Sequence, residues 1–382
     1  MDCEHMLRFP LLAILALCCS AVAPWTLTPI AKPVRGVGFG EAVIVDGVIV
    51  FEQLGTNAAI KRWEDGSVST LVPQTAQIPK GEGHFIGFGP IAFDGTRVAF
   101  VGHGASKEPS GFAGVYLWNA GARSRVVDSH VTVPGRPDDK FRYFHSVSVG
   151  GSLIAIDATD DHHFHGVYDA DADGVHVIAV PGTTYENGHK AFTEAGGGFV
   201  SNGAVIFHAQ TTTDSSHFVQ GIYAWQKGTI TRLLDTTQSF PPGGHFISMD
   251  LRSVDGTDLA GNGGFAGTGV FLKYVKGKPA VVASFRNPAP GVVGRVNAIE
   301  DGAIKNGSVL CLVGHEAQRI LVSDFGGTLA KVLGTGDPLD GKTVAKITLT
   351  PQAFDGKRAV ITVYFSDMST MIYIATPATT RP

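Results

Sequence analysis

Short apolar runs alternate with glycine-containing turns along almost the whole chain. The clearest stretch runs from Gly87 to Asp128 and reads GFGPIAFDG, TRVAF, a loop, GVYLW, a second turn and RSRVV. Apolar runs of this length between turn residues predict four β-strands joined in order as an antiparallel meander. One such meander cannot enclose a hydrophobic core, so it needs neighbours of the same kind.

The same pattern returns along the chain with a period of about 50 residues. Its marker is the turn after the first strand of each unit, where a Gly that follows Asp, Asn or Gly predicts a tight hairpin. These turns indicate seven units. They are Asp46-Gly47, Asp94-Gly95, Gly150-Gly151, Asn202-Gly203, Asp255-Gly256, Asn306-Gly307 and Asp355-Gly356.

Each turn is followed by an apolar second strand, and a variable loop leads to a third strand that often carries an aromatic residue, such as Tyr116 or Tyr223. Because aromatic residues return at one position of successive units, we interpret them as packing between adjacent sheets rather than as sugar contacts. A second hairpin then leads to the fourth strand. Its glycines are Gly66, Gly121, Gly174, Gly228, Gly277 and Gly327.

The seventh unit ends after three strands, at MIYIATP. At the other end of the chain, the segment 26–34 is extended and precedes the first unit. We expect this segment to supply the missing outer strand, because it would close a ring and remove exposed sheet edges. The prediction is an all-β fold, a seven-bladed β-propeller of four-stranded antiparallel blades, formed by residues 24–382 as one domain.

Residues 26–376 resemble the β-propeller superfamily, and their VAF, GIY and PGG segments are similar to those of poorly characterised secreted bacterial propellers. The Gly-His and Trp-Asp pairs of WD40 blades and the double-Gly pattern of kelch blades are missing from the repeat. The resemblance therefore implies a fold and no particular activity.

Composition agrees with an all-β protein, since 49 glycines and 20 prolines in 382 residues favour many turns. The formal charge of -4 excludes a typical nucleic-acid-binding protein, which would carry a basic domain or stripe.

The first 23 residues have the features of a secretory signal peptide: Arg8, an apolar segment from Leu11 to Cys19, and small residues around a cleavage site near Ala21 or Ala23. The apolar segment is too short to span a membrane. We therefore expect an extracellular or periplasmic protein that is not stably inserted in a membrane once the signal is removed. Cys311 is the one cysteine outside this segment, and its apolar surroundings predict a buried thiol.

Basic or imidazole side chains precede the first strand of several units. If they converge at one mouth of the central channel, they form a ring suited to an anionic ligand such as a uronate or a sulfated glycan. The alternative is that they pack over the first strand as structural residues of the repeat. The side chains are Arg35, His84, Lys140, His245, Arg295 and Lys342.

Polar residues near the ends of the second strands form a further set that we expect at the same face. A His beside a Tyr or an Arg is suited to abstracting a proton next to a carboxylate that the Arg neutralises, as in β-elimination. The residues are Glu52, His103, Asp157, His208, Asn262, His315 and Tyr364.

Two functions follow from these sets, and we favour the first. It is a binding module for an extracellular glycan or another small anionic ligand, with Arg35, Lys140, His103, His208, His315, Lys342 and Tyr364 as ligand-binding residues. The second is a polysaccharide-active enzyme, a lyase or glycoside hydrolase, with His84, His245 and Arg295 as its catalytic residues.

The loop DDHHFHG is the densest group of potential metal ligands. Asp161, His163 and His165 are candidate ligands for zinc, copper or manganese, with a solvent-facing loop as the alternative. Asp169, Asp171 and Asp173 match the start of a calcium loop, although an ordinary Asp-Gly hairpin at residues 173–174 explains the same residues.

Overall fold

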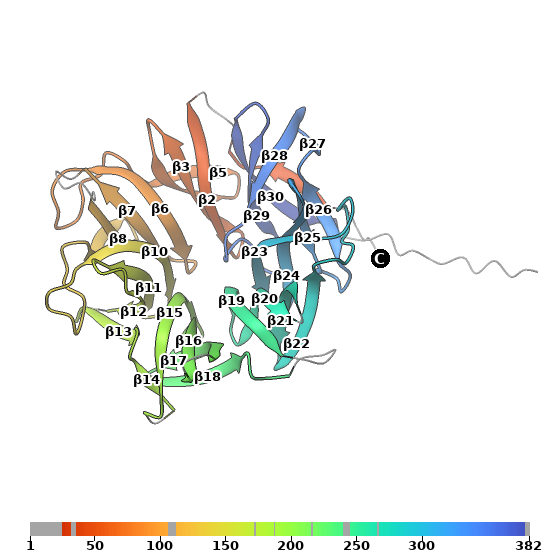
Figure 1. Ribbon diagram of the computed structural model, residues 1–382. Helices are drawn as coiled ribbons and strands as arrows, with labels where there is room; N and C mark the ends of the chain where they lie inside the picture. The colour runs from red at the N-terminus through yellow and green to blue at the C-terminus, as the bar shows by residue number, and fades with distance from the viewer. Residues whose placement is uncertain are drawn as a thin grey trace, which may run out of the picture.

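The computed structural model describes residues 25–31, 36–105, 112–171, 173–186, 188–214, 217–239, 245–265 and 267–378. Its strands form seven antiparallel sheets arranged as blades around a central axis (Figure 1). Within each blade the strands follow one another from the axis outward. The predicted seven-bladed β-propeller is confirmed.

The first three blades each contain four strands. Blade 1 consists of β2 (Val37–Val45), β3 (Val48–Gly55), β4 (Ala59–Glu64) and β5 (Ser67–Pro73). Blade 2 consists of β6 (Phe85–Phe93), β7 (Arg97–Gly104), β8 (Phe112–Asn119) and β9 (Ala122–Asp128). Blade 3 consists of β10 (Phe141–Gly150), β11 (Leu153–Asp160), β12 (His165–Ala170) and β13 (Val175–Ala179).

The next three blades repeat this order. Blade 4 consists of β15 (Lys190–Ser201), β16 (Ala204–Asp214), β17 (His217–Gln226) and β18 (Thr229–Asp235), with the short β14 (Thr184–Tyr185) beside β15. Blade 5 consists of β19 (Phe246–Asp255), β20 (Asp258–Phe265), β21 (Thr268–Val275) and β22 (Lys278–Ser284). Blade 6 consists of β23 (Ala298–Lys305), β24 (Ser308–His315), β25 (Gln318–Ser323) and β26 (Ala330–Gly334).

Blade 7 joins the two ends of the described chain. It consists of β28 (Lys342–Thr348), β29 (Ala359–Phe365), β30 (Thr370–Pro377) and β1 (Trp25–Pro29), with the short β27 (Pro338–Leu339) beside β28. β1 pairs antiparallel with β30, from Trp25 opposite Pro377 to Pro29 opposite Tyr373. The N-terminal segment therefore supplies the outer strand of the last blade, as predicted.

Three of the seven marker turns, Asp46-Gly47, Asn202-Gly203 and Asn306-Gly307, have a positive φ at both residues, and the other four have it only at the second residue, a glycine. At Asp46-Gly47, for example, φ is 50° and 83°, and Asn202-Gly203 has 49° and 73°. Two consecutive residues with positive φ are typical of the type I′ turn, which matches the twist of the strands that it joins.

Large side chains of the third strands fill the space between blades. Tyr116, Tyr168, Tyr223 and Tyr373 are almost completely buried, and Phe271 occupies the same place in blade 5. Each such side chain contributes roughly 1.5–3 kcal/mol by burial. These positions confirm that the recurring aromatic residues are core residues.

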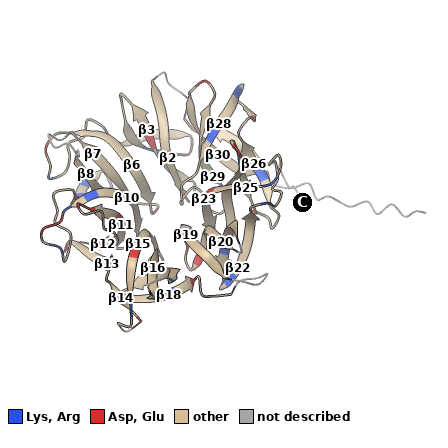
Figure 2. Ribbon diagram, in the orientation of Figure 1, with Lys and Arg blue, Asp and Glu red and all other residues tan. Residues whose placement is uncertain are grey.

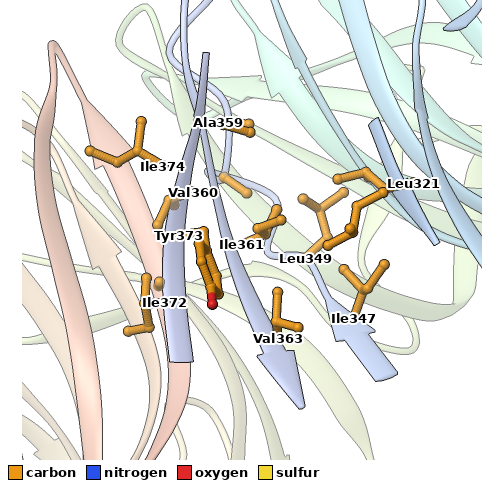
Figure 3. Packing of buried hydrophobic residues seen from close by; sticks show 14 of the residues in the cluster. Leu321, Ile347, Leu349, Ala359, Val360, Ile361, Val363, Ile372, Tyr373 and Ile374 are labelled. Atoms are coloured by element: carbon orange, nitrogen blue, oxygen red, sulfur yellow. The ribbon is translucent and has the colours of Figure 1, made fainter. Parts of the chain in front are cut away.

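Blades 6 and 7 show this packing at close range. Leu321 of β25 lies against Ile347 and Leu349, while Ile361 and Tyr373 belong to the same cluster (Figure 3). Cys311 is buried in the neighbouring cluster, and burial raises the pKa of its thiol. The prediction of an inert core thiol at this position agrees with that environment.

Within the described residues there is no helix of the length and apolarity that crossing a membrane requires. The expected signal peptide, residues 1–23, lies outside the described part of the chain.

Candidate functional site

The innermost strands are bulged at the points where polar residues gather around the axis. In β2 the register shifts between Phe39 and Ala42, and in β23 it shifts between Ile299 and Gly302. Glu41 and Asp301 therefore lie in bulges. A bulge adds a residue to one strand and redirects its side chain. Equivalent bulges lie at His145 in β10 and at Arg252 in β19.

Glycines in or beside these bulges let second-strand side chains reach past the innermost strand. A Cβ on Gly197 would lie 2.9 Å from Nδ1 of His208, and one on Gly40 would overlap the carboxylate of Glu52. A Cβ on Gly89 would likewise lie 3.4 Å from Nε2 of His103. The absence of a side chain on the inner strand therefore makes room for the polar residue behind it.

Blades 3 and 4 hold the most connected group. Asp157 is buried, and one of its carboxylate oxygens accepts a hydrogen bond from the backbone N–H of Gly197 at 2.9 Å. The other oxygen contacts Nε2 of His165. The rings of His165 and His145 are 4.9 Å apart, edge to face, and Nε2 of His145 lies 2.5 Å from the Thr159 hydroxyl. Asp157 thus fixes His165 and joins two blades.

The histidines of this group have opposite electrostatic environments. The hydrogen bond that the His165 ring donates to the Asp157 carboxylate raises the pKa of His165 despite partial burial. Burial lowers the pKa of His208, against the opposing effect of Asp250 and Asp157. Burial also lowers the pKa of His145. Near neutral pH, His165 is therefore the imidazole that holds a proton most readily, while His208 is held in its neutral form.

A cavity of about 540 Å³ lies between blades 4 and 5, and we call it the blade 4/5 cavity. Its polar lining comes from two carboxylates, an imidazole, side-chain amides and a hydroxyl, and its apolar lining includes an aromatic ring. The main residues are Glu194, His208, Gln210, Gln220, Ser248, Asp250, Asn262, Met249, Val270, Phe285 and Ile299. Among the described residues that line it there is no Lys or Arg.

Two polar atoms of this lining lack a hydrogen-bond partner within the described residues. They are Nδ1 of His208 and Oδ1 of Asn262, and both are shielded from solvent. Asn262 is held in place because its Nδ2 donates to the carbonyl of Glu300 at 3.0 Å. Buried polar atoms normally find partners, so His208 and Asn262 are lining residues whose polar capacity the described part of the chain leaves unsatisfied.

The wall of the blade 4/5 cavity is preorganised. Gln220 donates to Oε1 of Gln210 at 3.2 Å and accepts from the backbone N–H of Met249 at 3.0 Å. The ring of Phe285 lies over Gly269, where a Cβ would come within 2.8 Å of it. The lining therefore combines amides that hydrogen bonds hold in place with an aromatic ring.

A second cavity, of about 410 Å³, lies between blades 7 and 1, and we call it the blade 7/1 cavity. Glu41, Glu52, Asp301, Thr348 and Tyr364 contribute its polar lining. Burial, and then the neighbouring Glu41, raise the pKa of Glu52 to about 7. Burial likewise raises the pKa of Glu41, although the backbone N–H of Ile91 donates to it at 3.1 Å.

The residues of the expected cationic ring occupy separate blades. His84, Lys140 and His245 are exposed, each just before the buried residue that begins the first strand of its blade, and Arg295 is exposed just before the buried Val296, which precedes β23. Lys342 pairs with Asp367 at 2.8 Å. Arg35 lies outside the described residues. Figure 2 shows Lys and Arg dispersed over several blades.

One contact does join two members of the predicted sets. Nδ1 of His315 lies 2.8 Å from the carbonyl oxygen of Arg295. Among the described residues, the other side chains of the cationic set make no hydrogen bond or ion pair with one another. Of the second-strand set, His208 and Asn262 share the blade 4/5 cavity, and Glu52 and Tyr364 share the blade 7/1 cavity.

The candidate metal ligands of the His-rich loop do not converge. His165 contacts Asp157, His162 pairs with Asp139 at 2.6 Å, and His163 has a positive φ of 65° in the turn. Asp161 is exposed and accepts from the backbone N–H of Lys140 at 3.3 Å. No group of three or more His, Cys, Asp or Glu side chains in the described part of the chain is arranged to hold a metal ion.

The candidate calcium loop is a turn. Asp171 accepts from the backbone N–H groups of Asp173 at 2.8 Å and Gly174 at 3.2 Å. Its side chain therefore stabilises the hairpin between β12 and β13, which agrees with the alternative explanation of these residues.

The sequence did not point to Glu41, Glu194, Asp250 or Asp301. All four belong to innermost strands, where an acidic residue in an apolar run was the available signal. Their direction depends on the bulges, which the periodicity of the sequence does not reveal.

Comparison with known proteins supports the fold and nothing narrower. No family model and no curated protein sequence matches the chain. The β-propeller domain of the Trilobed protease from Pyrococcus furiosus is 9% identical, with a TM-score of 0.57 over 91% of this chain and 99% of that chain. That domain is described as having an open velcro topology, whereas here β1 closes blade 7.

Other similar structures are enzymes that contain a propeller. Pyrococcus horikoshii acylaminoacyl peptidase is 10% identical, with a TM-score of 0.56 over 92% of this chain, and the chain spans about half, 52%, of that peptidase. Polysaccharide lyase Uly1 is 9% identical, with a TM-score of 0.46 over 90% of each chain. At these identities the likeness is one of fold, and the chain is a seven-bladed β-propeller without a narrower family.

Proposed function

We propose that this protein binds a glycan in the blade 4/5 cavity. The observation that supports the proposal is the mixed lining of this cavity, which combines carboxylates, amides and a hydroxyl with aromatic and aliphatic groups. Sugar hydroxyls donate and accept hydrogen bonds, which carboxylates and amides satisfy from opposite sides. The C–H face of a sugar ring can pack on an aromatic side chain such as Phe285.

The charge of the cavity favours a neutral or amine-bearing sugar. Glu194 and Asp250 bring two carboxylates to the lining, and no described Lys or Arg lines it. Asp250 is already paired with Arg252 at 2.7 Å, so a uronate or sulfate group would lose its hydration beside two carboxylates and would compete with Asp250 for that guanidinium. The proposed ligand therefore differs from the anionic glycan that the basic residues of the sequence led us to expect.

A binding panel tests the proposal. Isothermal titration calorimetry with cello-, xylo-, manno- and chitosan oligosaccharides, and with oligogalacturonate and oligoalginate, should give binding to at least one neutral or amine-bearing member and weaker binding to the uronates. His208→Ala and Asn262→Ala should each lower the affinity about tenfold, a loss of about 1.4 kcal/mol. Lys278→Ala, on an exposed side chain of the outermost strand of blade 5, is the matched control and should bind as the wild type does.

Two results would count against the proposal. If no oligosaccharide binds, the glycan assignment fails. If binding is strong but His208→Ala and Asn262→Ala leave it unchanged, the ligand occupies another part of the molecule.

A second candidate, cleavage of the bound glycan, is favoured by the two histidines near the cavity. Enzymes that transfer protons often hold two titratable groups whose pKa values are pushed apart. The hydrogen bond that His165 donates to Asp157 raises the pKa of His165, while burial lowers that of His208. Incubation with the corresponding polysaccharides should then release new reducing ends, and His208→Ala should abolish the release. If the protein binds the polysaccharide but releases no reducing ends, the binding module remains the proposed function and the enzyme is excluded.

Export belongs to the same proposal, because a glycan-binding propeller with an N-terminal signal peptide would act outside the cytoplasm. N-terminal sequencing of the mature protein should place its first residue after Ala21 or Ala23. A mature chain that retains residues 1–20 would contradict this part of the proposal.

A further inference from the structure

We propose that the blade 4/5 cavity and the blade 7/1 cavity are two subsites of one cleft near the axis of the propeller, and that this cleft binds an oligosaccharide. The inference rests on the proposed function and extends it, because it assigns a ligand longer than the sugar unit that one cavity holds. It also assigns a binding role to Glu41, Glu52, Thr348 and Tyr364, which lie outside the blade 4/5 cavity.

The two cavities are linked by one arginine. Arg252 pairs with Asp250 at 2.7 Å and with Asp301 at 3.3 Å. Asp250 lines the blade 4/5 cavity, and Asp301 lines the blade 7/1 cavity. A single guanidinium group therefore holds one carboxylate of each cavity. The two linings are thus close enough for one side chain to contact both.

Arg252 has the properties of a group that a ligand can use. Its side chain is 37% exposed, and its Nε is buried without a hydrogen-bond partner among the described residues. The planar guanidinium is fixed by its two carboxylate partners, which limits the conformational entropy lost on binding. Arg252 itself lines neither cavity, so its role in the cleft is to hold Asp250 and Asp301 in place.

The lining of the blade 7/1 cavity matches that of the first in chemical type. Carboxylates of Glu41, Glu52 and Asp301 lie with the hydroxyls of Thr348 and Tyr364, next to aliphatic groups, and the described lining contains no Lys or Arg. The Lys346 ammonium lies over the Tyr364 ring, 5.4 Å from its centre. Both cavities therefore suit uncharged or amine-bearing sugars, as expected for two parts of one cleft.

Glu52 gives the second cavity a hydrogen-bond donor as well as acceptors. Its side chain is buried, and a pKa of about 7 means that it carries a proton for part of the time at neutral pH. A protonated carboxyl donates to a sugar oxygen, while the neighbouring Glu41 accepts from a sugar hydroxyl.

The length dependence of binding tests this inference. Calorimetric titration with cello-, xylo-, manno- and chitosan oligosaccharides of one to six units should show an affinity that rises at least tenfold between the shortest ligand that binds and the longest. Tyr364→Ala should remove most of this rise and leave the affinity for the shortest ligand within about twofold of the wild type. His208→Ala should weaken all lengths.

Tyr364→Phe keeps the ring and removes only the hydroxyl, so it provides a second variant should Tyr364→Ala fold poorly, and it should remove a smaller part of the rise. An affinity that does not change with length, while His208→Ala still abolishes binding, overturns the two-subsite cleft and leaves the proposed function standing. A Tyr364→Ala variant that loses affinity equally for oligosaccharides of every length also overturns the two-subsite cleft. If no ligand of any length binds, both proposals fail.

Discussion

Individual residues determine which polar groups reach the centre of this propeller. Glycines such as Gly40 and Gly197 leave room for Glu52 and His208, which belong to second strands that otherwise lie inside the core. Burial then changes the protonation of these groups, because charged forms lose hydration that the protein replaces only partly. Stability and ligand binding therefore depend on the same few positions.

Glu52 should make the stability of the protein depend on pH. Its pKa is about 7 in the folded state, above the ordinary value of 4.5 that it regains on unfolding. The folded state therefore binds the proton more tightly, and the free energy of unfolding should fall as the pH rises from about 4.5 through 7. Glu52→Gln keeps a neutral group, so it should stabilise the protein at pH 8 by up to roughly 3 kcal/mol and have little effect near pH 4.5.

Urea unfolding at the two pH values measures this difference. Glu64→Gln, on an exposed side chain of the same blade, is the matched control. A Glu52→Gln variant whose stability difference from the wild type is the same at both pH values would show that Glu52 is already ionised at neutral pH.

Two buried tyrosines should respond in opposite ways to loss of their hydroxyl. The Tyr373 hydroxyl donates to Oδ2 of Asp340 at 2.9 Å, whereas the buried Tyr116 hydroxyl has no hydrogen-bond partner among the described residues. Tyr373→Phe should lower the free energy of unfolding by about 1 kcal/mol. Tyr116→Phe should leave it unchanged or raise it, because an unsatisfied polar group is removed. Equal losses in thermal or urea unfolding would contradict this difference.

At the scale of elements, the strands explain both the closure of the ring and the position of the site. β1 covers the edge of β30, so blade 7 has the same number of main strands as the others. The innermost strands carry bulges in or beside which most of the charged and imidazole groups near the axis lie, including Glu41, His145, Arg252 and Asp301. Regular strands would have kept these side chains in a strict alternation.

Removal of β1 should destabilise the whole ring. A variant that lacks residues 1–31 leaves the edge of β30 exposed, and exposed edges pair with other chains. We expect a lower thermal midpoint and more aggregation than in a variant that lacks residues 1–24, which keeps β1 and serves as the control. Light scattering and thermal unfolding of the two variants measure the effect. Equal stability of the two would mean that β1 contributes little to closure.

The sequence predicted the architecture well, because seven copies of one pattern reinforce each other. The hairpin at Asn202-Gly203, the buried Tyr223 and the pairing of the N-terminal segment with β30 all follow from local rules that recur in each unit. The unit around Asp258 and Phe271, whose sequence pattern is the least clear of the seven, also forms a blade.

The site was predicted only in part. Asp157, His208, Asn262 and Tyr364 were expected near one face, since they occupy related places in their second strands. The basic residues before the first strands were also visible in the sequence; each belongs to a different blade, and the ring that they were expected to form stays a prediction. Which side chains share a cavity depends on bulges and on contacts between blades, and neither appears in the pattern of a single repeat.

For the whole molecule, the ring brings together residues that are far apart in the sequence. Glu41 and Tyr364 share one cavity, and Arg252 links it to the cavity that contains His208. A ring of rigid blades holds such groups in fixed positions, which limits the entropy lost on binding. This arrangement supports the central claim that the cavities near the propeller axis bind a neutral or amine-bearing glycan.

The most direct test is a crystal structure of the protein with the oligosaccharide that binds best in the calorimetric panel. Our account predicts electron density for a sugar in the blade 4/5 cavity, within hydrogen-bonding distance of His208 and Asn262 and with one face against Phe285. Sugar density confined to the exposed basic residues His84, Lys140, His245 or Arg295, with the blade 4/5 cavity empty of sugar, would contradict it.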